Sequence, residues 1–302
     1  MNMTRILCPT DLSEASDHAI DLAIVLAGAA RARITAIHVA APVVVPLEIG
    51  PPGSVALDDA EIDALVAKTT ARFSEASRAG IDVDVFVDRG APADRILHRA
   101  ASLPADVIVM GTHGSRGFER LVLGSVTERV LRQARCPVLT VPPRAHATST
   151  LPFRRILCAI DFSEPSIAAL QYAASLAAGS DAVITLLHVL EWPWHEPPPP
   201  NFAELPAPQG AALAEYRRYR EQMAVTELEA LAPMTAGLSR PPVIRLRHGK
   251  PYVQILEVAA EEGTDLIVIG VHGRNPVDLM LLGSTANQLA RRATCPVLTL
   301  RQ

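Results

Sequence analysis

One sequence pattern occurs twice in this chain of 302 residues, and any fold must accommodate both copies. RILCPTDLS at 5–13 matches RILCAIDFS at 155–163, and DVIVMGTHG at 106–114 matches DLIVIGVHG at 265–273. The copies are 150 residues apart at the start and 159 at the end, so the second holds nine more residues. We expect these in the Pro-rich stretch 192–208. Such self-similarity predicts one folding unit used twice, at 1–143 and 155–302, with a linker at 144–154.

Within each copy, short aliphatic runs alternate with helical patterns. In the first copy, strands are predicted at 5–10, 33–39, 82–87, 105–110 and 136–141. Helices are predicted between them, at Ser13–Ala29, Asp58–Ala79, Ala93–Ser102 and Ser125–Ala134. This alternation predicts the α/β class: a Rossmann-like, open parallel five-stranded sheet with helices on both faces. The second copy repeats it from Arg155 to Leu300.

Composition narrows the range of partners. The formal net charge of -4 and the sequence pI near 6.1 argue against a nucleic-acid-binding face. The start, MNMTRILCPTD, lacks the apolar region of a signal peptide, and no apolar run is long enough to span a bilayer. We therefore expect a cytoplasmic protein without membrane contact. The four cysteines fit neither metal nor disulfide spacing, and are interpreted as buried apolar residues in strand-like runs.

A glycine pattern, G-x2-G-x9-G-S, follows the fourth predicted strand of each copy, at 111–125 and at 270–284. Glycines at a strand end let backbone N–H groups approach a ligand, and a helix start favours anions. Ser125 and Glu128 also fit a capping box, so Ser125 could cap the helix, hold a phosphate, or do both. The alternative is that these glycines only form turns. Neither a P-loop nor an early G-x-G-x-x-G is present.

These residues resemble the universal stress protein family in its tandem two-domain form. The resemblance spans both copies and rests on PTDLS, on IHVA, and on the glycine pattern before CPVLTV. It implies an adenine nucleotide alpha hydrolase-like fold that binds ATP, with Mg²⁺ arriving on the nucleotide rather than at a protein metal site. The ATP-binding residues implied for the first domain are Pro9, Thr10, Asp11, Val39, Met110, Gly111, Gly114, Gly124, Ser125, Val126 and Thr127.

The second domain departs from this pattern at several positions. Pro9 and Thr10 become Ala159 and Ile160, and Thr127 becomes Ala286. The residues that the resemblance still implies for ATP binding are Asp161, Val189, Ile269, Gly270, Gly273, Gly283, Ser284 and Thr285. If Thr127 bonds a phosphate, its loss weakens the second site about tenfold, so we expect two sites with the first tighter.

Other polar residues have ordinary interpretations. His38 and His188 are expected to be hydrogen-bonded structural residues, because strand alternation turns them away from the adjacent valines. His113, His272 and Arg116 lie in the glycine loops, where either a ligand contact or a solvated side chain is possible. The tryptophans at 192 and 194 lie in the Pro-rich insert, which is either a surface loop or a lid.

The resemblance leaves three functions open. The first is a regulatory ATP-binding stress-response protein with slow or no hydrolysis, since no general base is evident and no catalytic residue is assigned. The second is a slow ATPase. The third is an interaction module that binds another adenine ligand, such as cyclic AMP. The final strand of each unit is expected to pair with its counterpart within the chain, and whole chains could form homodimers.

Overall fold

A computed structural model describes residues 3–40, 43–45, 53–55, 58–113, 123–143, 153–191, 207–271 and 282–301. For 43–45, 53–55 and 207–213 it describes the backbone alone. The first unit consists of β1 (Arg5–Thr10), α1 (Glu14–Ala30), β2 (Arg33–Ala40), β3 (Val43–Val45), β4 (Gly53–Val55), α2 (Asp59–Arg72), α3 (Ser74–Arg78), β5 (Val83–Arg89), α4 (Pro92–Ser102), β6 (Val107–Gly111), α5 (Ser125–Gln133) and β7 (Val138–Val141).

The second unit follows the same order. It consists of β8 (Arg155–Ala159), α6 (Glu164–Ala177), β9 (Val183–Leu190), α7 (Ala207–Leu231), the 3₁₀ turn η2 (Ala232–Thr235), β10 (Val243–His248), α8 (Pro251–Glu262), β11 (Leu266–Gly270), α9 (Ser284–Arg292) and β12 (Val297–Leu300). Within the described residues, no helix is both long enough and apolar enough to cross a bilayer.

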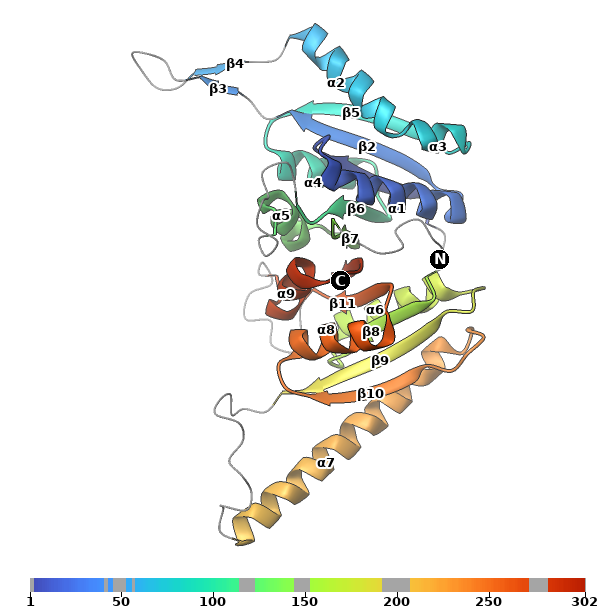
Figure 1. The fold of residues 1–302 in the computed structure, drawn as a ribbon, viewed down its shortest axis with the longest axis vertical. Helices are drawn as coiled ribbons and strands as arrows, with labels where there is room; N and C mark the ends of the chain where they lie inside the picture. Colours follow the sequence, from blue (N-terminus) through green and yellow to red (C-terminus); the bar gives the residue numbers. More distant parts are fainter. Residues whose placement is uncertain are drawn as a thin grey trace.

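The two units form one continuous sheet of ten strands (Figure 1). Its order is β10-β9-β8-β11-β12-β7-β6-β1-β2-β5, and neighbours within each unit are parallel. The units join through the antiparallel pair β7 and β12, in the register Val297–Thr140, Leu298–Leu139 and Thr299–Val138. This confirms the expected pairing of the final strands. Because they pair with each other, neither β7 nor β12 is an exposed edge strand.

Side-chain contacts strengthen this join. The Thr140 hydroxyl donates to the carbonyl oxygen of Val297 at 3.2 Å, and the Thr299 hydroxyl donates to that of Val138 at 3.1 Å. These reciprocal bonds reflect the two-fold relation between the units. The last helices of the two units also meet, because Glu128 Oε2 of α5 lies 3.5 Å from Arg291 Nη2 of α9.

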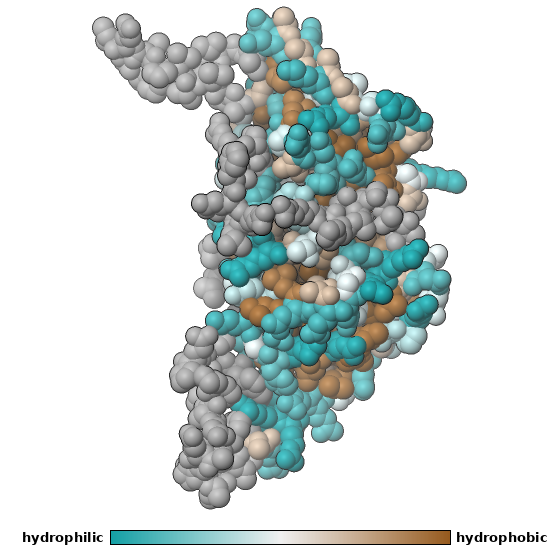
Figure 2. Space-filling model, viewed as in Figure 1, coloured by the Kyte–Doolittle hydropathy of each residue, from teal (hydrophilic) through white to brown (hydrophobic). Residues whose placement is uncertain are grey.

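Helices cover both faces of the sheet, as predicted. One buried cluster joins α1 and α6 to the strands of both units, while α4 with α5 and α8 with α9 belong to separate clusters on the other face. The sheet-facing residues of α1 include Ala19, Leu22, Ala23 and Leu26, which are fully or nearly buried. In the space-filling view, hydrophilic residues predominate over the helices and hydrophobic ones show mainly between them (Figure 2).

The predicted strands and helices of the first unit agree with the structure to within about two residues, with three corrections. The predicted helix 58–79 divides at Phe73, whose side chain is buried in the core. The short hairpin of β3 and β4 was not predicted. Cys136 and Cys295 precede β7 and β12 instead of lying within them, and Cys136 is only half-buried.

The second helix position differs most between the units. In the first unit it holds α2 and α3, whereas in the second it holds α7, whose 25 residues run along β10 and extend beyond the sheet (Figure 1). The last two residues of the Pro-rich stretch 192–208 begin α7, and the rest of that stretch, with both tryptophans, lies outside the described residues.

Candidate functional site

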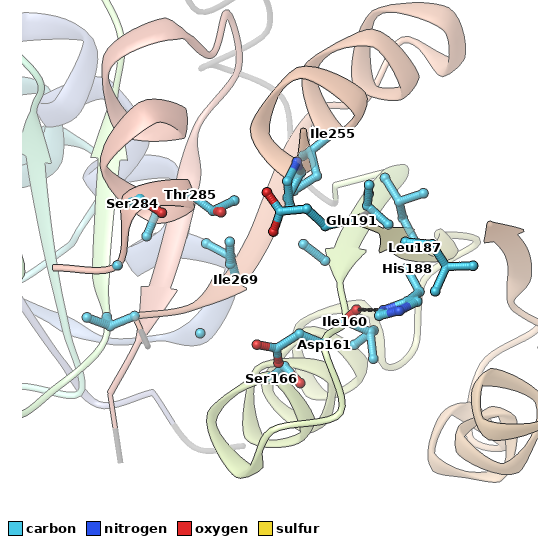
Figure 3. Close-up of a pocket in the computed structure, with 18 of the residues that line it drawn as sticks. Ile160, Asp161, Ser166, Leu187, His188, Glu191, Ile255, Ile269, Ser284 and Thr285 are labelled. Carbon is cyan, nitrogen blue, oxygen red and sulfur yellow. Dashed lines mark hydrogen bonds between the residues drawn. The ribbon is translucent and has the colours of Figure 1, made fainter. Parts of the chain in front are cut away.

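A pocket of about 470 Å³ lies at the carboxyl ends of β8, β9 and β11 (Figure 3). The chain order of the strands reverses between β8 and β11, and ligands of open α/β sheets bind at such a switch point. Seven residues implied by the sequence resemblance line this pocket: Asp161, Val189, Ile269, Gly270, Gly283, Ser284 and Thr285. The fold therefore brings together residues that are more than 100 positions apart in the sequence.

An acidic turn forms one wall of the pocket. Asp161 follows β8, and its Oδ1 accepts hydrogen bonds from the Ser163 N–H at 3.1 Å and the Ser163 hydroxyl at 2.5 Å. Between them, Phe162 adopts a left-handed backbone with a φ of 64°. A non-glycine residue at positive φ is strained, so the surrounding contacts must hold the turn in place. The turn fixes the position of the Asp161 carboxylate.

The first unit has the same turn. Asp11 Oδ1 accepts from the Ser13 N–H at 3.1 Å and from the Ser13 hydroxyl at 2.5 Å, and Leu12 also has a φ of 64°. Asp11 is exposed, whereas Asp161 is half-buried. The two units therefore present a carboxylate at the same place, and the second holds it in a more enclosed setting.

The histidines at the ends of β2 and β9 are structural, as predicted. His188 Nδ1 donates to the carbonyl oxygen of Ile160 at 2.7 Å (Figure 3). His38 Nδ1 donates to the carbonyl oxygen of Thr10 at 2.9 Å. Each bond ties the end of one strand to its neighbour beside the pocket. The half-buried residues that follow, Val39 and Val189, keep their backbone at the strand ends.

The glycines at the ends of β6 and β11 make room for the protein's own helices. A Cβ on Gly270 would lie 2.9 Å from Pro165 Cβ and 3.0 Å from the Ser166 nitrogen, at the start of α6. A Cβ on Gly111 would lie 3.2 Å from the carbonyl oxygen of Ala15 in α1. We expected these glycines to admit a ligand. The close contacts of both are with the starts of the protein's own helices, and Gly270 also lines the pocket.

The next helices begin beside the pocket. α5 begins at Ser125 and α9 at Ser284, and both serines are exposed. The N-cap residues, Gly124 and Gly283, are glycines and therefore have no side chain that could cap the helix. The first N–H groups of an α-helix lack intrahelical acceptors, so these amides and the helix dipole favour an anion.

The capping-box prediction is wrong. Ser125 is the first helical residue and not the N-cap, and the Glu128 carboxylate pairs with Arg291. The Glu128 N–H instead donates to the carbonyl oxygen of Gly124 at 2.9 Å, which is ordinary helical bonding. The Ser125 hydroxyl thus has no capping role in this structure.

Three other residues of the first unit lie inside the protein. The Thr127 hydroxyl donates to the carbonyl oxygen of Gly111 at 2.9 Å, and its side chain is buried. Thr10 is buried too, with its hydroxyl 3.0 Å from that of Ser16. Met110 is buried among apolar side chains. The Thr127 hydroxyl was expected beside the phosphates, so its replacement by Ala286 removes a bond within the protein and gives no reason for a weaker second site.

The pocket also contains charged residues that sequence reasoning missed. Glu191 follows β9, and its carboxylate points into the pocket (Figure 3). Arg220 reaches the pocket from α7, and its guanidinium donates to the Tyr216 hydroxyl at 3.2 Å. Apolar walls come from Leu187 and Ile255. The repeat could not reveal Arg220, because the two copies lose their similarity in the segment that forms α7.

Some predicted loop residues lie outside the described residues: Gly114, Arg116, His272 and Gly273. His113 is described, and partial burial lowers the pKa of its imidazole. Its Nδ1 lies 2.8 Å from the Thr112 hydroxyl. Among the described residues, no three His, Cys, Asp or Glu side chains are grouped as metal ligands.

The cysteines have inert surroundings. Cys8 and Cys158 are completely buried, which raises the pKa of both thiols well above its usual range. Burial also raises the pKa of Cys136 to about 11 and that of Cys295 to about 12. Since the thiolate is the reactive form, none of these thiols is suited to nucleophilic chemistry at neutral pH.

Comparison with known proteins agrees with this architecture. The model of the universal stress protein family matches residues 2–142 and again 152–301. A universal stress protein from Mycolicibacterium smegmatis is 31% identical over 307 residues, covering 98% of this chain and 96% of the relative. Universal stress protein A homolog 1 from Coxiella burnetii is 32% identical over 146 residues, covering 48% of this chain and 94% of that protein.

A solved structure extends the similarity to the fold of the whole chain. The universal stress protein from Archaeoglobus fulgidus has a TM-score of 0.66 and 25% sequence identity, with 100% of this chain and 97% of that chain covered. With two matches to one family model and relatives along its whole length, this chain belongs to the universal stress protein family.

Proposed function

We propose that this chain is a regulatory ATP-binding protein in which bound nucleotide is hydrolysed slowly or not at all. The observation that carries the proposal is the pocket at the carboxyl ends of β8, β9 and β11, where apolar walls lie beside an exposed helix start. Its volume of about 470 Å³ falls within the range of sites for small organic ligands.

The residues of the pocket suit the parts of an adenine nucleotide. Val189, Ile255 and Ile269 offer apolar surface for the base, and the end of β9 offers backbone groups to its polar edge. The Asp161 carboxylate is a hydrogen-bond acceptor for ribose hydroxyls. The first N–H groups of α9, with the Ser284 and Thr285 hydroxyls, are donors for phosphate oxygens. Mg²⁺ would enter with the nucleotide and offset the negative charge of its phosphates.

The first unit has the same elements, so we expect it to hold a nucleotide site of its own. Asp11 occupies the same turn as Asp161, and α5 begins at Ser125 as α9 begins at Ser284. Val39 corresponds to Val189 at the end of β2. We therefore expect two nucleotides per chain.

Slow ATP hydrolysis is a second candidate function, and Glu191 is the observation that favours it. Its carboxylate points into the pocket, where it could accept a proton from an attacking water (Figure 3). Glu191→Gln keeps the shape and removes the basicity. A rate of phosphate release from ATP that falls at least about tenfold in this variant would support ATPase activity. An unchanged rate would exclude Glu191 as the base.

A Mg-ATP titration by equilibrium dialysis tests the main proposal, once copurified ligand has been removed. Ser284→Asp places a negative charge beside the phosphates, while an acidic residue in the first turn favours the helix itself. Ser125→Asp does the same in the first unit. The matched controls, Ser284→Asn and Ser125→Asn, add similar bulk without charge.

The expected result is two ATP per chain, with one lost in each Asp variant and both kept in each Asn variant. Cyclic AMP binding more tightly than ATP would instead favour an adenine-ligand module. No ATP binding at millimolar concentration would contradict the proposal.

A further inference from the structure

A second cavity, of about 450 Å³, lies at the outer edge of the first unit. It is bounded by the end of β5, which is the terminal strand of the sheet, and by side chains of α2 and α4. Its lining is rich in cationic and imidazole side chains: Arg89, Arg95, His98 and Arg99, with Ile62, Val87 and Asp88. None of these residues belongs to the nucleotide sites described above.

Arg99 is fixed in place. It donates to Asp88 at 2.7 Å, and its guanidinium lies over the Phe86 ring, 4.0 Å from the centroid. The side chains of Arg99 and Asp88 are only 20% and 18% exposed, so they form a partly buried pair. Arg99 therefore offsets the charge of Asp88, which is the only carboxylate among the described residues that line the cavity.

Arg95 is also positioned by the protein. Its Nε donates to the carbonyl oxygen of Arg89 at 2.9 Å, so its terminal nitrogens are available to a ligand. Within the part of the chain that the structure describes, no carboxylate forms an ion pair with Arg89 or Arg95. Arg95, His98 and Arg99 are three and four residues apart on α4, which places them on one face of the helix.

The second unit has the opposite charge pattern at the matching positions. There Arg89, Arg95 and His98 are replaced by His248, Gln254 and Glu257. His248 pairs with Glu221 at 3.0 Å, and Gln254 donates to Glu257 at 2.7 Å. His248 therefore has an acidic partner, and Glu257 adds a negative charge where the first unit has His98. The cationic cavity is consequently a property of the first unit and not of the repeated fold.

We propose that this cavity is a binding site for a small phosphate-bearing molecule, distinct from the nucleotide sites. Arginine suits this role because its planar guanidinium presents paired donors to phosphate oxygens. Fixed side chains also lose less conformational freedom when the ligand binds. Arg89 and Arg95 would contact the phosphate, with Arg99 as the positioned third cation.

The test uses ³²P-labelled pyrophosphate as the probe, in equilibrium dialysis without Mg²⁺. The full chain carries Ser125→Asp and Ser284→Asp, so that the helix starts of the nucleotide sites repel the probe. In this background, Arg89→Ala with Arg95→Ala removes both proposed phosphate contacts and keeps the Arg99–Asp88 pair. The matched control, Arg245→Ala with Arg247→Ala, removes the same charge from β10, where each arginine pairs with a glutamate.

We expect one pyrophosphate per chain, with affinity that falls at least about tenfold in the Arg89/Arg95 variant and less than about twofold in the control. The affinity should also fall as salt is added, because the contact is ionic. Equal loss in both variants would show nonspecific attraction and overturn the proposal, as would no binding at millimolar probe. Unchanged binding in the Arg89/Arg95 variant would also overturn it, because the probe would then bind somewhere other than this cavity.

Discussion

The Thr127 hydroxyl of α5 donates to the carbonyl oxygen of Gly111, 2.9 Å away at the end of β6. This bond ties the first turn of the helix to the strand end beside the proposed nucleotide site. Ala286 occupies the equivalent position in the second unit and is likewise buried. The two units therefore fix the same helix differently, with a hydrogen bond in one and apolar packing in the other.

Thr127→Ala should lower the free energy of unfolding by about 0.5–1.5 kcal/mol, because the half-buried Gly111 loses the donor to its carbonyl oxygen. The dissociation constant for ATP should change less than about twofold, since the hydroxyl is directed into the protein. Urea unfolding and ATP dialysis measure the two quantities. Ser125→Ala is the control for stability, because that side chain is exposed. A large loss of ATP affinity with unchanged stability would show that Thr127 contacts the ligand.

Gly270→Ala should destabilise the protein by about 1–3 kcal/mol, because the new Cβ would overlap the start of α6. The nearest atoms, in Pro165 and Ser166, would lie only 2.9–3.0 Å away. Gly237→Ala is the matched control, since a Cβ there meets nothing within 4 Å. Thermal unfolding of both variants measures the difference. If the two variants have the same midpoint, Gly270 is not required by packing.

The sequence predicted most of the fold because the repeat and the aliphatic periodicity are local signals that two copies reinforce. It also predicted residues that line the pocket of the second unit, from Asp161 to Thr285, since their motifs survive in both units. It did not predict the direction of single hydroxyl groups. Thr10 and Thr127 resemble ligand contacts in the sequence, but tertiary packing turns both into the protein.

The features that escaped prediction depend on contacts between distant segments. Arg220 enters the pocket from α7, in a segment without similarity between the copies. The cationic cavity needs the end of β5 and one face of α4 to meet. The sequence singled out Gly111 and Gly270 by their spacing, but their close contacts with the starts of α1 and α6 come from tertiary packing, which no local pattern specifies.

Asp106 and Asp265 are equivalent residues that should respond to acid in opposite ways. Asp106 Oδ2 accepts from the Thr4 N–H at 2.6 Å and from the Arg5 N–H at 2.9 Å. Partial burial opposes its ionisation, but these bonds and the nearby Arg5 charge prevail and lower the pKa of Asp106. For Asp265, burial outweighs the bonds from Arg154 and Arg155 and raises the pKa.

A lowered pKa stabilises the fold above the ordinary Asp value of about 3.9, and this contribution disappears as the pH falls through the folded-state pKa. A raised pKa has the opposite effect on stability, so protonation of Asp265 favours the folded state. Asp106→Asn should therefore reduce the loss of stability in acid, whereas Asp265→Asn should increase it. Urea unfolding between about pH 2 and pH 7 measures both slopes. The same sign of change in the two variants would contradict this assignment.

Arg220→Ala should weaken nucleotide binding at the second site alone, because α7 supplies this cation only to the pocket beside β9. An exposed charge–charge contact contributes up to about 1 kcal/mol, which corresponds to a loss of affinity of up to about fivefold. Arg218→Ala is the matched control, since Arg218 is an exposed arginine of α7 outside the pocket lining. ATP dialysis in the Ser125→Asp background isolates the second site. Equal losses in both variants would mean that the general charge of α7 attracts nucleotide, whereas a loss confined to Arg220→Ala would make this side chain the feature that distinguishes the two sites.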